Sequence, residues 1–250
     1  MAARTSLTVE MKARLFDLIG DVIEAVREGN RDPMSVAAVL QEIKNHADFA
    51  GNLGLTSLVT ERVANDLEAL TQWQLLYREV FDIALDVSLI AMPKACCPGF
   101  GRLIVVAEGM TPNRIFEAMG KLFPSWRYTD DLDASLDPER AKRKASRAYA
   151  IRCRGRIEAD EELKNRSADD LDRDGVNTMT LEERLLYEII YFRETGRHLD
   201  QECITICSGS RFRYGRVPRV SWYPRAGEAY VRWCNPGDRG DAIRARAVVS

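Results

Sequence analysis

The chain has 250 residues, of which 46% are apolar and 30% are charged, and its formal net charge is −2. This composition excludes a chain that is disordered throughout, and the length permits one large core or two smaller ones. The sequence has no apolar stretch of about 18 residues and no signal-peptide pattern at its start, so we expect a soluble, cytoplasmic protein without membrane association.

The first part of the chain carries apolar residues at helical spacing. A helix is predicted over residues 9–28 and ends at Gly29, and a second begins at Pro33 behind the capping residue Asp32. A third and longer helix is predicted over residues 57–81, after a glycine-containing loop. Since a segment rich in Pro, Gly and Cys follows Met92, the sequence predicts a helical domain over residues 1–92.

The second part, residues 93–250, mixes helical and strand patterns. Thr111 caps a helix that begins at Pro112, and Thr180 with Glu183 forms a capping box at the start of a helix over residues 181–195. A further helix is predicted over 159–171, and strands are predicted over 103–107, 126–128, 149–157, 204–207, 217–223 and 230–233. The predicted fold class is therefore α+β, with a helical N-terminal unit followed by a mixed α/β part that ends in short antiparallel strands.

Several segments resemble a set of uncharacterised bacterial proteins of similar layout. They are RLIVVAEGMTPN, SWRYTDDLD, AYAIRCRGRIEADEELKNRS, TLEERLLYEIIYF, TICSGSR and RARAVVS, and together they span about residues 100–250. The resemblance leaves out the N-terminal helices. It implies no activity, cofactor or catalytic residue.

A cysteine and an arginine stand at the spacing of a cysteine-phosphatase loop. Cys207 and Arg213 have five residues between them and follow a predicted strand. In such a loop the backbone N–H groups and the arginine hold a phosphate while the thiolate attacks phosphorus. No helix is predicted directly after Arg213, although the phosphatase loop needs one, and a turn between two strands explains the same residues. Cys207 and Arg213 are therefore weak candidates for catalysis.

Two groups of residues suggest metal sites, but each has a simpler explanation. Asp170, Asp172, Asp174 and Gly175 match the first half of a calcium loop, but Glu182 comes one residue too late to complete it. Gly175 as a helix end and Thr180 as the next cap explain the segment without an ion. A zinc site built from His198, Cys203, Cys207 and Cys234 is disfavoured, because two of these thiols lie on one predicted strand about 13 Å apart. We therefore expect no cofactor and six reduced thiols that pack as small apolar groups.

Arginines and aromatic residues alternate in the last fifth of the chain. Residues 201–250 carry nine Arg, no Lys and four acidic residues. Arg binds carboxylates and phosphates with two hydrogen bonds and stacks on rings. Alternation allows the rings to face a ligand together with the arginines, or the rings to face the core while the arginines face solvent, and the second arrangement is slightly favoured. The predicted binding residues are Arg152, Arg154, Arg156, Arg211, Arg213, Arg216, Trp222 and Trp233.

The residues support no enzyme class. We expect a non-enzymatic binding or interaction module that recognises a protein partner through arginines and rings. Two alternatives remain open at this point. One is a nucleic-acid-binding protein that uses the same surface, and the other is a phosphoryl-transfer enzyme built on Cys207 or on the carboxylates.

Overall fold

The computed structural model describes residues 56–88, 90–93 and 99–250 and confirms the α+β fold class. The predicted helices over residues 9–28 and from Pro33 lie outside the described residues. The predicted domain boundary was at 92/93, but the compact unit that contains both sheets runs from Asp66 to Ser250. The last turns of helix α4 (Thr56–Phe81) therefore belong to the α+β unit.

Two aromatic side chains of α4 explain why the unit begins before the predicted boundary. They bond to the free edge of strand β1 (Arg102–Val106). The indole N–H of Trp73 donates to the carbonyl of Leu103 (3.1 Å). The hydroxyl of Tyr77 donates to the carbonyl of Val105 (2.9 Å) and accepts from the N–H of Ala107 (3.0 Å). Because buried backbone groups need partners, the helix and the strand form one structure.

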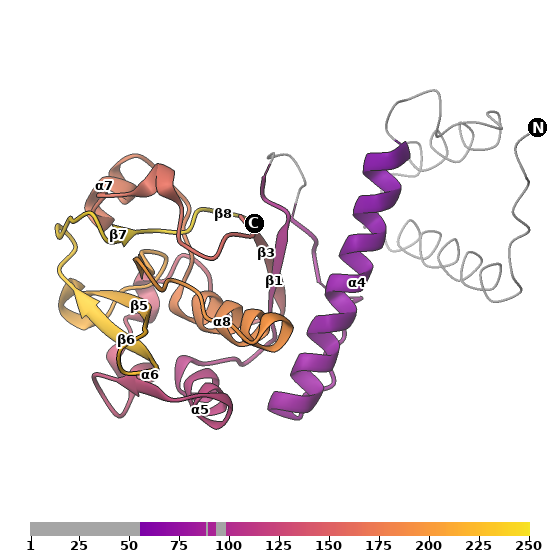
Figure 1. The fold of residues 1–250 in the computed structure, drawn as a ribbon, viewed down its shortest axis with the longest axis horizontal. Helices are drawn as coiled ribbons and strands as arrows, with labels where there is room; N and C mark the ends of the chain where they lie inside the picture. The colour runs from indigo at the N-terminus through magenta and orange to yellow at the C-terminus, as the bar shows by residue number, and fades with distance from the viewer. Residues whose placement is uncertain (1–55, 89, 94–98) are drawn as a thin grey trace, which may run out of the picture. The chain divides into compact units, whose positions relative to one another are not determined.

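The strands form two sheets, which lie on either side of one helix (Figure 1). The smaller sheet has the antiparallel order β1-β3-β8, with β3 at Tyr149–Cys153 and β8 at Val248–Val249. The larger sheet has the order β2-β6-β5-β4-β7. Its strands are β2 (Ser125–Arg127), β4 (Ile204–Ile206), β5 (Val217–Tyr223), β6 (Glu228–Cys234) and β7 (Ile243–Arg244). The pairs β2·β6 and β4·β7 are parallel, so the larger sheet is mixed rather than purely antiparallel.

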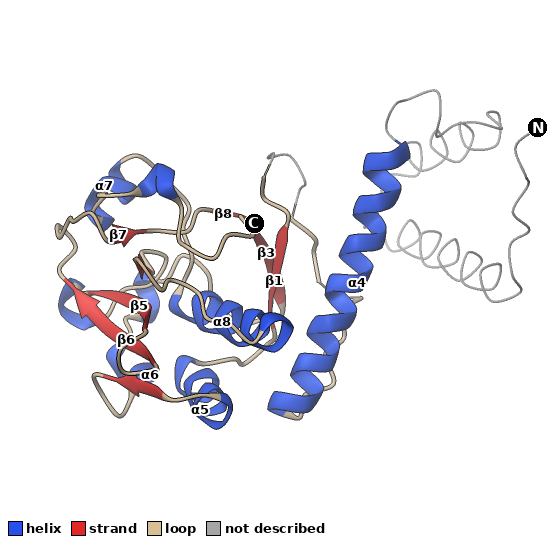
Figure 2. Ribbon diagram, in the orientation of Figure 1, coloured by secondary structure: helices blue, strands red, loops and turns tan. Residues whose placement is uncertain are grey.

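Helix α8 (Leu181–Thr195) lies between the sheets and packs on β1, on β5 and on helix α5 (Pro112–Leu122) (Figure 2). Both predicted caps are confirmed: Thr111 caps α5, and Thr180 with Glu183 forms the capping box of α8. The predicted helix over 159–171 is wrong. A 3₁₀ turn (Glu161–Leu163) ends at Lys164, Asn165 adopts a positive φ of 58°, and a separate helix α7 (Ala168–Arg173) begins behind Ser167.

Short elements complete the chain. They are helix α6 (Leu132–Ser135) and the 3₁₀ turns η1 (Pro138–Arg140) and η3 (Arg213–Gly215). None of the helices in the described residues is long and apolar enough to pass through a bilayer.

Two apolar clusters divide the larger sheet into a covered and an open part. The main cluster fills the space around α8, and the inner face of the larger sheet packs on it through Val220 and Val231. A second cluster contains Leu171 of α7, Ile206 and Val217, and it covers one part of the opposite, outer face. The remainder of that outer face, over β2, β6 and β5, has no helix packed on it among the described residues.

Candidate binding face

The predicted binding arginines around β3 are all held by acidic side chains. Arg152 was expected to point outward, but it is buried, and its guanidinium donates to Asp66 (2.6 Å). The next two arginines bind nearby carboxylates, Arg154 to Asp160 (2.6 Å) and Arg156 to Glu162 (2.7 Å). Strand alternation failed here because both faces of β3 are covered, so Arg152 needed a buried counter-charge.

The predicted arginines of the loop before β5 do not form one surface. Arg211 is buried, donates to the carbonyls of Ser208 (2.7 Å) and Ser210 (3.0 Å), and pairs with Asp172. Arg213 is exposed and donates to a carbonyl of α6, and Arg216 lies over the ring of Trp233, 3.7 Å from its centroid. These arginines point in different directions.

The predicted ring Trp222 faces inward rather than toward a ligand. It stacks on His198 with a centroid separation of 3.4 Å, and Phe123 contacts both rings. Trp233 also lies on this inner side of the sheet, packed against the main cluster. Both tryptophans therefore fit the expectation that rings pack in the core.

Cys207 does not have the surroundings of a nucleophile. It is fully buried, and burial raises the pKa of its thiol far above the usual range. Arg213 points away from it toward α6, and the loop is followed by the three-residue 3₁₀ turn η3 and then by β5, not by an α-helix. Gly209 packs so tightly that an added Cβ would lie 2.6 Å from the carbonyl oxygen of Thr178. The loop is thus filled by protein where a phosphatase would hold phosphate.

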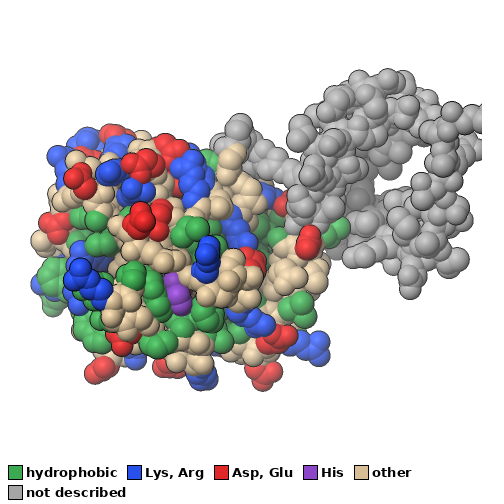
Figure 3. All heavy atoms as spheres, in the orientation of Figure 1, with side chains coloured by type: hydrophobic (Ala, Val, Ile, Leu, Met, Phe, Trp, Pro, Cys, Tyr) green, Lys and Arg blue, Asp and Glu red, His purple; other side chains and the backbone are tan. Residues whose placement is uncertain are grey.

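The carboxylates of the predicted calcium loop do not converge. Asp170 accepts from Arg239 (2.6 Å) and Arg173 (2.8 Å), Asp172 pairs with Arg211, and Asp174 pairs with Arg166. Figure 3 shows cationic and anionic side chains interleaved over this part of the surface. Asp170 and Asp172 lie within α7, so their side chains project in different directions and each meets its own arginine.

The residues of the disfavoured zinc site also separate. All four cysteines in the described residues are free and buried, and His198 lies against Glu188 (3.0 Å) and Trp222. Among the described residues, the one group of three possible metal ligands is Glu158, Asp200 and Cys203. Arg184 and Arg246 already neutralise Asp200, so this group is explained by the packing of the protein.

Four buried charges near α8 compensate one another. Asp200 accepts from Arg184 (2.9 Å) and Arg246 (2.6 Å), and Arg184 also donates to Glu188 (2.8 Å). Burial alone raises the pKa of Asp200, but Arg246 and Arg184 outweigh it and hold that pKa below its ordinary value. Two cations and two anions therefore form one buried network.

The open part of the larger sheet has a different character. Because side chains alternate along a strand, Arg219 and Tyr223 of β5 share the outer face with Tyr230 and Arg232 of β6. Trp126 of β2 pairs with Tyr230 and adds a third ring. We call this surface the Arg–Tyr face and define it by six residues: Trp126, Arg219, Ser221, Tyr223, Tyr230 and Arg232.

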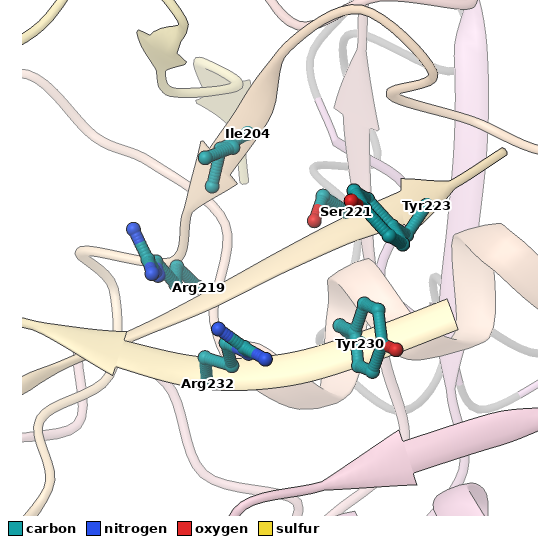
Figure 4. A pocket seen from close by; sticks show the side chains of 6 residues that line it. All are labelled: Ile204, Arg219, Ser221, Tyr223, Tyr230 and Arg232. Carbon is teal, nitrogen blue, oxygen red and sulfur yellow. The ribbon is translucent and has the colours of Figure 1, made fainter. Parts of the chain in front are cut away.

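The two arginines of the Arg–Tyr face lie directly opposite each other on neighbouring strands. Figure 4 shows their guanidinium groups at one end of the face and the two tyrosine rings toward the other. Arg232 lies 5.0 Å from the ring centroids of both Trp126 and Tyr230, so cation–π contacts hold its position. The hollow over the face has a volume of about 330 Å³, and no Asp or Glu lines it.

Comparisons of this chain with protein-family models, with curated proteins and with solved structures find no match. The Arg–Tyr face is therefore assessed by its own chemistry. Neither Arg219 nor Arg232 forms an ion pair or a side-chain hydrogen bond with any described residue. Among the residues that the structure places, this face thus offers two free guanidinium groups beside exposed rings.

A larger hollow of about 790 Å³ lies near the end of β1 and is a weaker candidate. Its lining combines alanines and Leu85 with three cations, Arg143, Lys144 and Arg147. Arg143 donates to Glu183 (2.6 Å) and to Asn177 (2.6 Å), so its charge is already used within the protein. The hollow is also lined by the carboxylates of Asp86 and Glu108, which distinguishes it from the hollow of the Arg–Tyr face, where no Asp or Glu is present.

The predicted set of binding residues omitted the residues of the Arg–Tyr face. Arg219, Tyr223, Tyr230 and Arg232 belong to the region noted for interleaved arginines and rings, but they were not selected. The spacing of two in VPRVSWY and EAYVRWC already placed them on one side of each strand. Trp126 gave no such signal, because its pairing with β6 joins segments about 100 residues apart.

Proposed function

We propose that this protein is a non-enzymatic interaction module that binds an acidic segment of a protein partner through the Arg–Tyr face. The observation that carries the proposal is the direct opposition of Arg219 and Arg232, neither of which forms an ion pair with a described residue. The one carboxylate of β6 on this side, Glu228, lies beside Tyr230 at the tyrosine end of the face. Like charges directly opposite each other destabilise a sheet. An anionic partner neutralises this repulsion. The relief of the repulsion therefore adds to the free energy of binding.

The composition of the face supports a protein partner over a nucleic acid. Arg, Tyr and Trp are the residues most enriched at the energetic centres of protein interfaces. Nucleic-acid affinity depends on several phosphate contacts, about 6–10 for a strongly salt-dependent complex. The Arg–Tyr face has two cations, and the whole chain has a net charge of −2 and a pI near 5.9. Single-stranded nucleic acid remains the second candidate, because exposed rings beside arginines can also stack on bases.

A titration of the full chain with poly-L-glutamate tests the proposal. Oligo(dT) and oligo(U) serve as competing probes, and each titration is run at a low and at a moderate salt concentration. Replacing Arg219 or Arg232 by alanine should weaken poly-L-glutamate binding about tenfold, as expected for an interfacial arginine. Arg197→Ala is the matched control, because Arg197 is exposed and forms no ion pair with a described residue.

Two results would overturn the proposal. One is tighter binding of an oligonucleotide than of poly-L-glutamate, with an affinity that falls steeply with salt and depends on Arg219 and Arg232; this would make the face a nucleic-acid surface. The other is the absence of binding to any of the three probes.

A further inference from the structure

Among the described strands, three of the four sheet edges are closed by other parts of this chain. The rings of α4 close β1, as described above. At β7, the backbone N–H of Asn165 donates to the carbonyl of Ile243 (2.9 Å). At β8, the N–H of Val248 donates to the carbonyl of Asn177 (2.8 Å). Exposed edges invite pairing with other chains, and these contacts prevent it.

The fourth edge, strand β2, is open. Its hydrogen bonds to β6 are made by every second residue: the carbonyl of Pro124 accepts from Ala229 (3.0 Å), and the N–H of Tyr128 donates to Val231 (3.1 Å). Since backbone groups alternate in direction along a strand, the N–H and C=O groups of Ser125 and Arg127 point away from β6. No described residue takes up these four backbone groups.

The open edge borders the Arg–Tyr face. Trp126, the central residue of β2, is 42% exposed on the outer side, and Arg232 leans over its ring from the neighbouring strand. A strand added beside β2 would lie about 4.8 Å from it and would place every second side chain next to Trp126. Carboxylates at those positions would lie within reach of the Arg232 guanidinium.

We propose that the acidic partner segment binds in extended conformation as an added strand along β2, with its carboxylates turned toward Arg232. This inference rests on the proposed function and specifies how the partner is held. Backbone hydrogen bonds to Ser125 and Arg127 provide affinity, and the charge of Arg232 selects acidic side chains, as in other complexes formed by strand addition.

Charge favours an acidic partner over a second copy of this chain. Pairing of β2 with the β2 of another copy would bring two Arg232 guanidinium groups and two Trp126 rings to one edge, with no carboxylate in the lining of either hollow. In such a dimer neither Arg232 guanidinium gains a counter-charge. An acidic segment supplies the opposite charge.

Strand addition along β2 predicts that the two arginines contribute unequally to binding. Arg232 is on β6, next to β2, and Arg219 is on β5, one strand farther from the edge. Neighbouring strands are about 4.8 Å apart, so an added strand lies much closer to Arg232. Arg232→Ala should therefore weaken binding more than Arg219→Ala, whereas a segment that crosses the face would depend on both equally.

The test uses a hexapeptide of alternating Glu and Val and the same hexapeptide N-methylated at alternate residues on its pairing edge. Both have the same charge, but the methylated peptide cannot donate the hydrogen bonds that strand addition needs. Binding to the full chain is measured by calorimetry, and the exchange of the Ser125 and Arg127 amide hydrogens is followed by NMR. The expected result is at least about tenfold weaker binding of the methylated peptide and slower exchange at these two amides with the unmethylated one.

The possible outcomes separate this inference from the proposed function. Equal affinity for the two peptides, with equal losses in Arg219→Ala and Arg232→Ala, would overturn strand addition and leave the Arg–Tyr face as the binding surface. Failure of both peptides and of poly-L-glutamate to bind would overturn the proposed function itself. A dimer in sedimentation that the peptide dissociates would assign the β2 edge to a second copy and would also overturn the inference.

Discussion

The arginines of this protein lie in two different environments. Around α8, Arg184 and Arg246 are buried and share Asp200, which lies between them. On the outer face of the larger sheet, Arg219 and Arg232 lie side by side with no carboxylate in the hollow that they line. The first set stabilises the fold by compensating buried charge, and the second leaves positive charge available to a partner.

The sheet edges show the same contrast between groups with and without partners in the protein. The edge of β1 is closed by Trp73 and Tyr77, while the edge of β2 has backbone groups without a partner among the described residues. The open edge of β2 and the free guanidinium group of Arg232 both lie beside Trp126. Their coincidence on one surface is more informative than either feature alone, because one partner segment can use the backbone groups and the cation together.

Removal of the Asp200 carboxylate from the buried network around α8 should cause the largest loss of stability. Asp200→Asn would leave Arg184 and Arg246 without their shared counter-charge, and breaking a buried ion pair in this way costs about 3–5 kcal/mol. Urea unfolding measures the loss in free energy, and Asp241→Asn is the control because Asp241 is exposed. A loss no larger than that of the control would mean that the network contributes nothing to stability.

Weakening the contacts that close the edge of β1 should cause the next largest loss of stability. Tyr77→Phe keeps the ring but removes the hydroxyl that serves Val105 and Ala107, so two buried backbone groups lose a partner. We expect the free energy of unfolding to fall by about 1–3 kcal/mol. Faster hydrogen exchange at Ala107 in the variant would locate the change, and unchanged exchange there would contradict the account of this edge.

A partly buried acid, Glu182, should make stability depend on pH. Burial raises the pKa of Glu182 to about 7, and its Oε2 has no hydrogen-bond partner among the described residues. The folded state therefore holds a proton that the unfolded state has lost, so this group's contribution is fully present below its unfolded pKa and is lost as the pH rises toward 7. Glu182→Gln should remove that loss and unfold at a free energy about 1–3 kcal/mol higher than the wild type at pH 8. A difference between variant and wild type that does not grow between pH 5 and pH 8 would contradict this assignment.

The open face should show the smallest effect on stability. Arg219→Ala removes one of two like charges and no ion pair, so the free energy of unfolding should stay within about 0.5 kcal/mol of the wild type or rise slightly. Thermal unfolding of the variant beside Arg197→Ala checks this. A loss of several kcal/mol would show that Arg219 stabilises the fold, as Arg184 and Arg246 do.

Local signals in the sequence predicted most elements correctly. The capping box at Thr180 and Glu183 and the proline behind Thr111 located both large helices of the α+β unit, because caps act within one turn. The helix predicted over 159–171 failed at Asn165, whose positive φ has no distinctive local pattern. Apolar periodicity cannot detect a single residue of this kind.

The candidate site was harder to predict because it depends on tertiary contacts. Alternation placed Arg152 on an outer face, and only the packing of Asp66 against β3 shows that this face is covered. Similarly, nothing local distinguishes Arg211, which is buried, from Arg219, which is free. Whether an arginine meets a carboxylate is decided by segments far apart in the chain.

The most direct test compares the two sets of arginines in one experiment. NMR spectra of the guanidinium Nε–H groups are recorded while the full chain is titrated with the hexapeptide of alternating Glu and Val. Shifts at Arg232 and Arg219, with Arg184 and Arg246 unchanged, are the predicted result. Unchanged signals at Arg219 and Arg232, with the peptide bound elsewhere or not at all, would contradict the claim that the Arg–Tyr face is the surface this protein uses for recognition.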